Sequence, residues 1–269
     1  DMGAEVIKMN TLWDSFWHKC HIASMANRNK RSLAVMLKHP KGMEAIKKVI
    51  ATCDVVQHNM RYPATQRLGL DYESLKTEFP GLIYCHSRGF EDGPRKNLPG
   101  NDQTGACLAG IQHEDGALYA GTDDTFPLWA LTSLGDTGNG FLTAVGICNA
   151  LMERERTGKG QFVDTSIVNA CLLSSSYAVA KPDGSGVDRP RLNADQTGYG
   201  DYYRLYKCAD GKWIQVAAIR PEHKTAFDKL AGVDKIAAFA GRGSAELMAD
   251  LAGAGVPASI SDGEASRKM

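Results

Sequence analysis

This sequence lacks the features of several large classes of protein, and each absence narrows what the chain can be. Its 269 residues carry no net charge, because 31 Lys and Arg balance 31 Asp and Glu. No overall basic field therefore attracts nucleic acid or a membrane surface. No apolar run approaches the length of a membrane-spanning helix, and no signal-peptide pattern opens the sequence. We expect neither nucleic acid nor membrane among its partners.

The cysteines of this sequence lack a metal-binding or disulfide pattern. The 7 cysteines are odd in number and widely spaced, without a C-x-x-C pair. This argues against a disulfide framework and a zinc knuckle, and it favours reduced thiols in a cytoplasmic protein. His18 and His21 lie close together, but no H-E-x-x-H frame surrounds them. We therefore expect no metal.

The short nucleotide-binding motifs are also missing. The glycine-rich GDTGNG segment does not have the G-x-G-x-x-G spacing, and TGKGQ lacks the spacing of a phosphate-binding P-loop. There is no internal repeat and no low-complexity tract. What remains is an ordinary globular composition, 43% hydrophobic and 23% charged.

Short apolar strands alternate with helical segments through the first two thirds of the chain. We predict strands at 6–9, 32–37, 54–58, 82–87 and 161–164. We predict helices at 43–52, 72–78 and 167–180, and a long helix that follows GDTGNG and ends near Gly158. This alternation predicts a Rossmann-like, doubly wound parallel sheet, whose ligands gather at the carboxyl ends of the strands. The Gly- and Pro-rich segment 88–99 is then a plausible active-site loop.

The character of the sequence changes near residue 200. Residues 182–200 resemble a linker, and the segments 202–207 and 212–218 flank Ala209-Asp210-Gly211, which favours a hairpin. Antiparallel strands after parallel ones indicate a second domain. We predict a large α/β domain over residues 1–195 and a smaller α+β domain over residues 196–269.

One carboxylate, Asp136, stands among Gly135, Gly138 and Gly140. An ordinary helix N-cap would explain an Asp here and contributes about 1 kcal/mol. The glycines suggest more, because each costs up to about 1 kcal/mol in a helix relative to alanine, so something needs to come close. A carboxylate at a helix N-terminus stays ionised, which suits a nucleophile, and free N–H groups nearby could hold an oxyanion. We predict a reactive Asp136.

Taken together, several stretches resemble the class III CoA-transferase family, which includes formyl-CoA and carnitine CoA-transferases and the α-methylacyl-CoA racemases. They occur in the family's order and cover nearly the whole chain. The matching stretches are DMGAEVIKM, NRNKRSLAVMLKHPKG, DVVQHN with RLGLDYESL, PGLIYCHSRGFEDGP, PGNDQTGA, GDTGNG, LMERERTGKGQFVDTSIVNA and YYRLYKCADGKWIQVAA.

The resemblance implies a fold, a partner and a reaction. It implies a large CoA-binding and catalytic domain, a small domain and an interlocked homodimer. The family is longer at both ends, so we expect an N-terminal start and a C-terminal return to the large domain to be missing from this sequence. In the transferases, an aspartate matching Asp136 attacks an acyl-CoA and passes CoA to a carboxylic acid acceptor through covalent intermediates.

The resemblance also assigns roles to further residues. Lys38, Asn59 and Arg67 match positions that contact CoA in relatives, and Lys or Arg charge suits its phosphates. The alternative is that Lys38 and Arg67 are solvated surface charges. A loop that contacts substrate or an oxyanion would comprise Asn101, Gly135, Gly138 and Gly140.

The racemases of this family use a histidine in a Gly-His-Asp stretch as a second base. Here the matching residues are Gly100-Asn101-Asp102, and an asparagine cannot accept the proton. We therefore favour an acyl-CoA:carboxylate CoA-transferase with CoA as substrate and carrier. An α-methylacyl-CoA racemase or epimerase and a catalytically inactive CoA-binding homologue are the alternatives.

Overall fold

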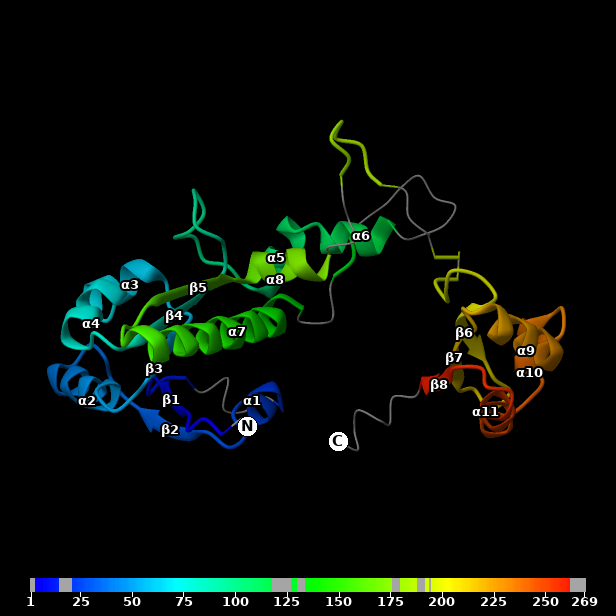
Figure 1. The fold of residues 1–269 in the computed structure, drawn as a ribbon, viewed down its shortest axis with the longest axis horizontal. Coiled ribbons are helices and arrows are strands. Elements are labelled where there is room, and N and C mark those ends of the chain that lie inside the picture. Colours follow the sequence, from blue (N-terminus) through cyan, green and yellow to red (C-terminus); the bar gives the residue numbers. More distant parts are fainter. Residues whose placement is uncertain are drawn as a thin grey trace. The chain divides into compact units, whose positions relative to one another are not determined.

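The computed structural model describes residues 3–14, 21–117, 127–129, 134–175, 180–187, 192–193 and 195–261. The chain forms two compact units. The first comprises residues 1–109 and 130–176, and the second comprises residues 110–129 and 177–269. The fold is mixed α/β with parallel sheets, which confirms the predicted class (Figure 1). The predicted domain boundary at 195 stays a prediction, and the predicted linker lies partly outside the described residues.

The strands of the first unit are parallel. Strand β1 (Ile7–Asn10) pairs with β2 (Arg31–Ala34) in one sheet. A second sheet has the order β3 (Val55–His58), β4 (Ile83–Arg88) and β5 (Phe162–Ser166). Strand β4 is the central strand and is almost wholly buried, as expected of a parallel strand covered on both faces. The single continuous sheet predicted from the sequence is thus two short sheets.

Helices cover these strands, and the residues around their ends explain where they start. The helices of the first unit are α1 (His21–Ala26), α2 (Pro40–Ile50), α3 (Tyr62–Leu68), α4 (Tyr72–Glu78), α5 (Asp102–Leu108), α7 (Leu134–Thr157) and α8 (Ile167–Ser174). Helix α2 starts at a proline, and the carboxylate of Asp71 accepts the Ser74 N–H at 3.2 Å to cap α4. Helix α7 packs along α8, β4 and β5 (Figure 1).

The second unit is built on an antiparallel sheet. Its order is β6 (Tyr203–Lys207), β7 (Trp213–Ala217) and β8 (Ala258–Ser261), and β6 and β7 form the predicted hairpin. Its helices are α6 (Ile111–Ala117), α9 (Pro221–Ala231), α10 (Lys235–Ala240) and α11 (Ser244–Gly253). The sequence analysis assigned neither these helices nor β8.

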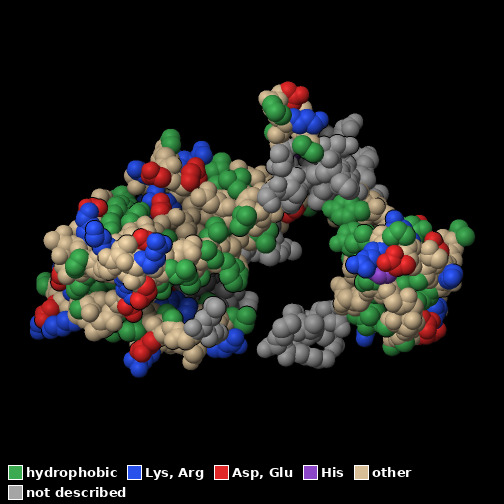
Figure 2. All heavy atoms as spheres, viewed as in Figure 1, with side chains coloured by type: hydrophobic (Ala, Val, Ile, Leu, Met, Phe, Trp, Pro, Cys, Tyr) green, Lys and Arg blue, Asp and Glu red, His purple; other side chains and the backbone are tan. Residues whose placement is uncertain are grey.

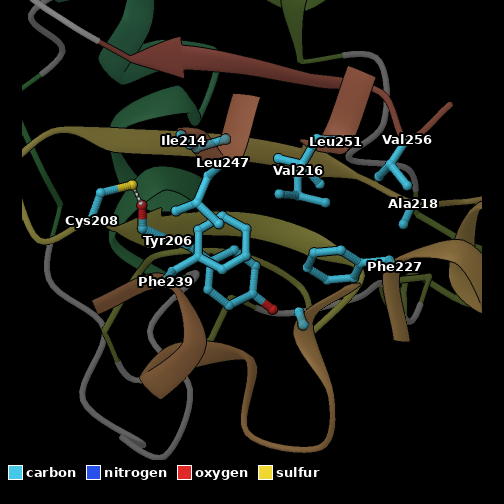
Figure 3. Close-up of a cluster of buried hydrophobic side chains, with 11 residues drawn as sticks. Tyr206, Cys208, Ile214, Val216, Ala218, Phe227, Phe239, Leu247, Leu251 and Val256 are labelled. Carbon is cyan, nitrogen blue, oxygen red and sulfur yellow. Dashed lines mark hydrogen bonds between the residues drawn. The ribbon is translucent and has the colours of Figure 1, made fainter. Parts of the chain in front are cut away.

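Aromatic rings fill the core of the second unit. Phe227, Phe239 and Tyr206 are buried together, and the rings of Tyr206 and Phe239 lie 4.5 Å apart between centroids (Figure 3). The hairpin turn also holds a helix end, because the Asp210 carboxylate accepts the backbone N–H of Ser244 at 3.1 Å. Sheet and helices are therefore joined by both apolar packing and a cap.

One face of α7 exposes apolar side chains. Phe141, Val145 and Met152 are each more than half exposed, and Cys148 between them is also exposed. Their spacing places them on one stripe of the helix. Figure 2 shows hydrophobic side chains at the surface over α7. Within the described part of the chain, no helix is both long and apolar enough to cross a membrane.

Candidate functional site

Three helices of the first unit meet beside Asp136 at their N-terminal turns. Asp102 is the first residue of α5, Asp136 is the third of α7, and Ile167 is the first of α8. A Cβ built on Gly135 would lie only 2.6 Å from Cγ2 of Ile167 and 2.7 Å from Oδ1 of Asp102. The backbone of α7 therefore touches both neighbours at this point.

A hydrogen bond joins the two carboxylate residues. The backbone N–H of Asp136 donates to Oδ1 of Asp102 at 2.8 Å. The first N–H groups of a helix have no partner within it, so Asp102 satisfies one of those of α7. Asn101 in turn fixes the start of α5, because it accepts the Thr104 N–H at 3.0 Å and donates its own N–H to Thr104 Oγ1 at 2.9 Å.

A crossing of two glycines brings the start of α5 next to the end of β4. A Cβ on Gly89 would lie 2.5 Å from Cα of Gly100, so the two backbones pack directly together. The Gly89 carbonyl also accepts the N–H of Val168 in α8 at 3.3 Å. The site thus lies just beyond the carboxyl end of β4, where a parallel sheet is expected to place its ligands.

The surroundings of Asp136 make its carboxyl group a weaker acid. Burial against the neighbouring helices raises the pKa of Asp136, and the negative charge of Asp102 raises that pKa further. The side chain nevertheless keeps an exposed face. The sequence argument considered only the helix dipole, which acts in the opposite direction. A raised pKa gives a carboxylate that is more basic, and hence a better nucleophile, once it is ionised.

The structure gives a packing reason for two of the three glycines. All three lie within α7, because the helix starts at Leu134. A Cβ on Gly138 would lie 3.1 Å from Cβ of Ala170 in α8, whereas a Cβ on Gly140 would meet nothing within 4 Å. The missing side chains of Gly135 and Gly138 therefore make room for the neighbouring helices. A role of these glycines toward substrate stays a prediction.

We expect Gly135→Ala to lower the free energy of unfolding by about 1–3 kcal/mol, because the added methyl group would overlap Ile167 and Asp102. Gly140→Ala is the matched control on the same helix. It adds a methyl group in open space, so it should be neutral or stabilising by up to about 1 kcal/mol. Urea unfolding of both variants measures the difference. Equal effects would contradict the packing described here.

The three residues matched to CoA contacts lie on exposed segments of the same unit. Lys38 follows β2, Asn59 follows β3 directly, and Arg67 is in the last turn of α3. Among the residues that the structure describes, the three do not bond to one another or to Asp136. Lys38 and Arg67 also have no ion-pair partner there, so both cations are free to meet a phosphate. Their assignment to CoA stays a prediction.

Sequence reasoning missed a buried polar cluster at the ends of β3 and β4. The rings of His58 and His86 stack with centroids 4.7 Å apart, and the backbone of Met60 bonds both rings. Burial lowers the pKa of His58 to about 3, helped by repulsion from His86. Burial, together with the charge of Arg88, lowers the pKa of His86 to about 4. Both rings are therefore neutral at physiological pH.

A second missed group links the sheet to α7. Thr143 of α7 lies 2.7 Å from the hydroxyl of Ser87 in β4 and 2.9 Å from that of Thr165 in β5. One turn earlier, Asn139 is only 4% exposed, and its Oδ1 has no hydrogen-bond partner among the described residues. The contacts of Thr143 hold the rotation of α7 on the sheet, and thereby the direction of Asp136. The segment GDTGNG contained Asn139, but only a fold could show it to be buried.

A metal-binding cluster was not expected. Within the described ranges, no group of three or more His, Cys, Asp or Glu side chains is placed to hold a metal ion. His18 and the side chain of His21 lie outside what the structure describes.

Comparison with known proteins identifies relatives over most of the chain. A model of the family described as CoA-transferase family III matches residues 1–259. An α-methylacyl-CoA racemase from Mus musculus is 33% identical over 224 residues, which are 82% of this chain and 56% of the racemase. A formyl-CoA:oxalate CoA-transferase from Bradyrhizobium sp. (strain ORS 278) is 30% identical over 204 residues, 69% of this chain and 46% of that protein. The chain thus spans about half the length of the curated relatives that it matches.

The fold has solved counterparts. The crystal structure of a CAIB/BAIF family protein from Brucella suis matches with a TM-score of 0.72 and 25% sequence identity. The match covers 98% of this chain and 78% of that chain. The mixed α/β fold is therefore that of a known family of structures.

Proposed function

Because the chain belongs to CoA-transferase family III, we propose that it moves CoA between carboxylic acids through a covalent intermediate on Asp136. The family is enzymatic, and its members include both CoA-transferases and racemases. The observation that carries the proposal is the setting of Asp136. Its carboxylate is partly exposed, its pKa is raised, and its backbone is held by Asp102 at the meeting of three helices.

The reaction begins with attack of an Asp136 oxygen on the thioester carbonyl of the donor acyl-CoA. The carbon–sulfur bond breaks, and the products are an aspartyl mixed anhydride and CoA thiolate. The thiolate then attacks the aspartyl carbonyl, which gives an aspartyl-CoA thioester and releases the donor acid as its carboxylate. The acceptor carboxylate attacks the aspartyl thioester, whose carbon–sulfur bond breaks to give a second mixed anhydride and CoA thiolate. The thiolate then attacks the acceptor acyl carbonyl of this anhydride, the carbon–oxygen bond to the aspartate breaks, and the new acyl-CoA leaves. Asp136 is regenerated, and no proton is gained or lost.

Lys38, Asn59 and Arg67 are proposed to hold CoA. The two cations have no ion-pair partner among the described residues, and both stand on exposed segments. Positive side chains of this kind suit the phosphates of a nucleotide. Asn59 lies directly after β3, at the carboxyl end of a parallel strand. The bound phosphates would then lie at the edge of the sheet that also leads to Asp136.

The racemase alternative is supported by the 33% identical relative from Mus musculus. Removal of an α-proton from one face and its return on the other requires two bases. Asn101 stands where the racemases have their histidine, and its side chain is bonded to Thr104 at the start of α5. An amide cannot take the proton, so we favour transfer. A catalytically inactive CoA-binding homologue is the remaining alternative.

The test is to trap the intermediate. Full-length protein is incubated with a panel of acyl-CoAs and quenched with hydroxylamine, and the peptide that contains Asp136 is analysed by mass spectrometry. A hydroxamate on Asp136 is expected. Parallel incubation in deuterium oxide measures exchange at the α-carbon of the acyl group. Exchange without an adduct would favour the racemase, and neither signal would favour the inactive homologue.

We further propose that the full-length protein forms a homodimer, interlocked as the resemblance implies. The exposed apolar stripe of Phe141, Val145 and Met152 supports burial of this face of α7 in an assembly. A reducing, cytoplasmic location is supported by the free thiols of the described cysteines, of which Cys85, Cys171 and Cys208 are buried.

A further inference from the structure

The Oδ1 oxygen of Asp102 lies against the backbone at the start of α7. It accepts the backbone N–H of Asp136 at 2.8 Å. The same oxygen lies where a side chain on Gly135 would have to be, because a Cβ there would be 2.7 Å away. Asp102 therefore reaches the backbone of α7 only because residue 135 has no side chain.

The position of Asp102 is itself fixed. It is the first residue of α5, whose start is held by the capping box of Asn101 and Thr104. Gly100, just before that box, packs on the backbone of Gly89 at the end of β4. A chain of contacts thus runs from the sheet through α5 to the backbone of Asp136.

We propose that Asp102 is a positioning residue for Asp136: its carboxylate anchors the first turn of α7 to α5, so that the Asp136 carboxylate faces the acyl-CoA in one orientation. This inference rests on the proposed function. Asp102 acts on Asp136 and not on the substrate. It acts through the backbone of α7 and through the repulsion between its own carboxylate and that of Asp136.

The charge of Asp102 has a separate consequence that a purely structural contact would not have. Burial raises the pKa of Asp136 most, and the charge of Asp102 raises it further. The other titratable group facing Asp136 is Cys171 of α8, whose pKa is raised to about 11 by burial and by the two carboxylates, so its thiol is neutral. His86, Arg88 and Asp164 on β4 and β5 do not contribute to the shift at Asp136. Removal of the Asp102 charge should therefore lower the pKa of Asp136.

Two substitutions separate the hydrogen bond from the charge. Asp102→Asn keeps an oxygen that can accept the Asp136 N–H but removes the charge. Asp102→Ala removes both. We expect Asp102→Asn to move the pH midpoint of adduct formation on Asp136 to lower pH, with KM for acyl-CoA unchanged. We expect Asp102→Ala to slow adduct formation by about 10- to 100-fold, as misorientation of a reacting group does.

The chain offers a matched control in its second unit. Asp210 likewise accepts a backbone N–H in the first turn of a distant helix, that of Ser244 in α11, at 3.1 Å, and it accepts the Ser244 hydroxyl at 2.6 Å. Asp210→Asn therefore weakens the same kind of contact away from Asp136. It should lower the urea midpoint by an amount similar to Asp102→Asn, with the pH midpoint and rate of adduct formation unchanged.

The titration of Asp136 is also measured directly, by carbon NMR of full-length protein labelled at the aspartate carboxyl groups. This readout does not need turnover. An Asp136 titration that is the same in Asp102→Asn as in the wild type would overturn the positioning role, as would equal pH profiles of Asp102→Asn and Asp210→Asn. A wild-type protein that forms no adduct, but whose Asp136 titration shifts in Asp102→Asn, would contradict the proposed function and retain the contact between the two carboxylates.

Discussion

Asp136→Asn is expected to lower the turnover number at least about 1,000-fold, because an amide cannot attack a thioester and form the covalent intermediate. The substitution keeps the size of the side chain. The bond from the backbone N–H of residue 136 to Asp102 does not involve the side chain that is changed. The fold and CoA binding should therefore persist, and a steady-state assay with the acyl-CoA that labels the wild type measures the loss.

The control removes another carboxylate from the same helix. Glu153 is exposed near the other end of α7, where its carboxylate pairs with Arg156 at 3.7 Å. Glu153→Gln should leave turnover within about twofold of the wild type, since surface changes away from a site have small effects. Full turnover in Asp136→Asn would exclude both the transferase and the racemase mechanism at this residue. If the inactive variant binds CoA as the wild type does, the substitution has removed the chemical step and not substrate binding.

The stability of the first unit is expected to fall steeply between pH 6.5 and pH 4. The pKa of His58 is lowered to about 3 and that of His86 to about 4, both chiefly by burial, from an ordinary value near 6.5. Below pH 6.5 the unfolded chain binds protons at these rings, while the folded protein does not. Stability therefore rises with pH across this interval, and each histidine contributes a slope of about 1.4 kcal/mol per pH unit. The contribution is fully present above the unfolded pKa.

A comparison of slopes isolates the histidines from other groups. Burial also raises the pKa of Asp136 and of Asp164, and these carboxyl groups act in the opposite direction as the pH falls. His58→Asn removes one titrating ring but keeps an acceptor for the Met60 N–H, which His58 Nδ1 accepts at 3.1 Å. Urea unfolding at pH 7, 6 and 5 should show an average slope smaller than in the wild type by about 1 kcal/mol per pH unit, because the unfolded ring is only partly protonated above pH 6.

His39 supplies the control for this experiment. Its Nδ1 accepts the N–H of Lys41 at 3.2 Å, which is the same local contact as that of His58 with Met60, but on an exposed ring. His39→Asn should leave the wild-type slope in place, because it removes neither ring of the buried pair. Similar slopes for His58→Asn and the wild type would show that the buried pair does not control acid unfolding.

Local pattern was enough to find most strands of the first unit. The β3, β4 and β5 strands begin and end within two residues of the predictions, because short apolar runs between turn residues report burial in a parallel sheet. Helix α4 was predicted with its observed limits, and Asp71 caps it. The division into two sheets could not be predicted, because strand pairing depends on contacts between distant residues.

The sequence pattern did not predict where α7 starts. Three glycines in six residues argue against a helix, yet α7 runs through all of them from Leu134. The packing of Gly135 and Gly138 against α5 and α8 outweighs the low helix propensity of glycine. Such packing between distant segments cannot be read from a local sequence pattern. Asp136 was singled out from the sequence as a reactive residue, which stays a prediction. The bond from Asp102 to its backbone required the fold, because the two residues are 34 positions apart.

The backbones of Gly89 and Gly100 pack together at the base of a loop. This contact holds the two ends of the loop in place, whichever residues the loop itself contains. The segment 91–99 between them is mostly exposed, while the two glycine backbones are in direct contact at its base. Its length and sequence can therefore diverge during evolution without moving α5 or the carboxylates that α5 positions. Under the proposed function, such a loop is a suitable place for relatives to acquire new acyl-group preferences while Asp136 keeps its position.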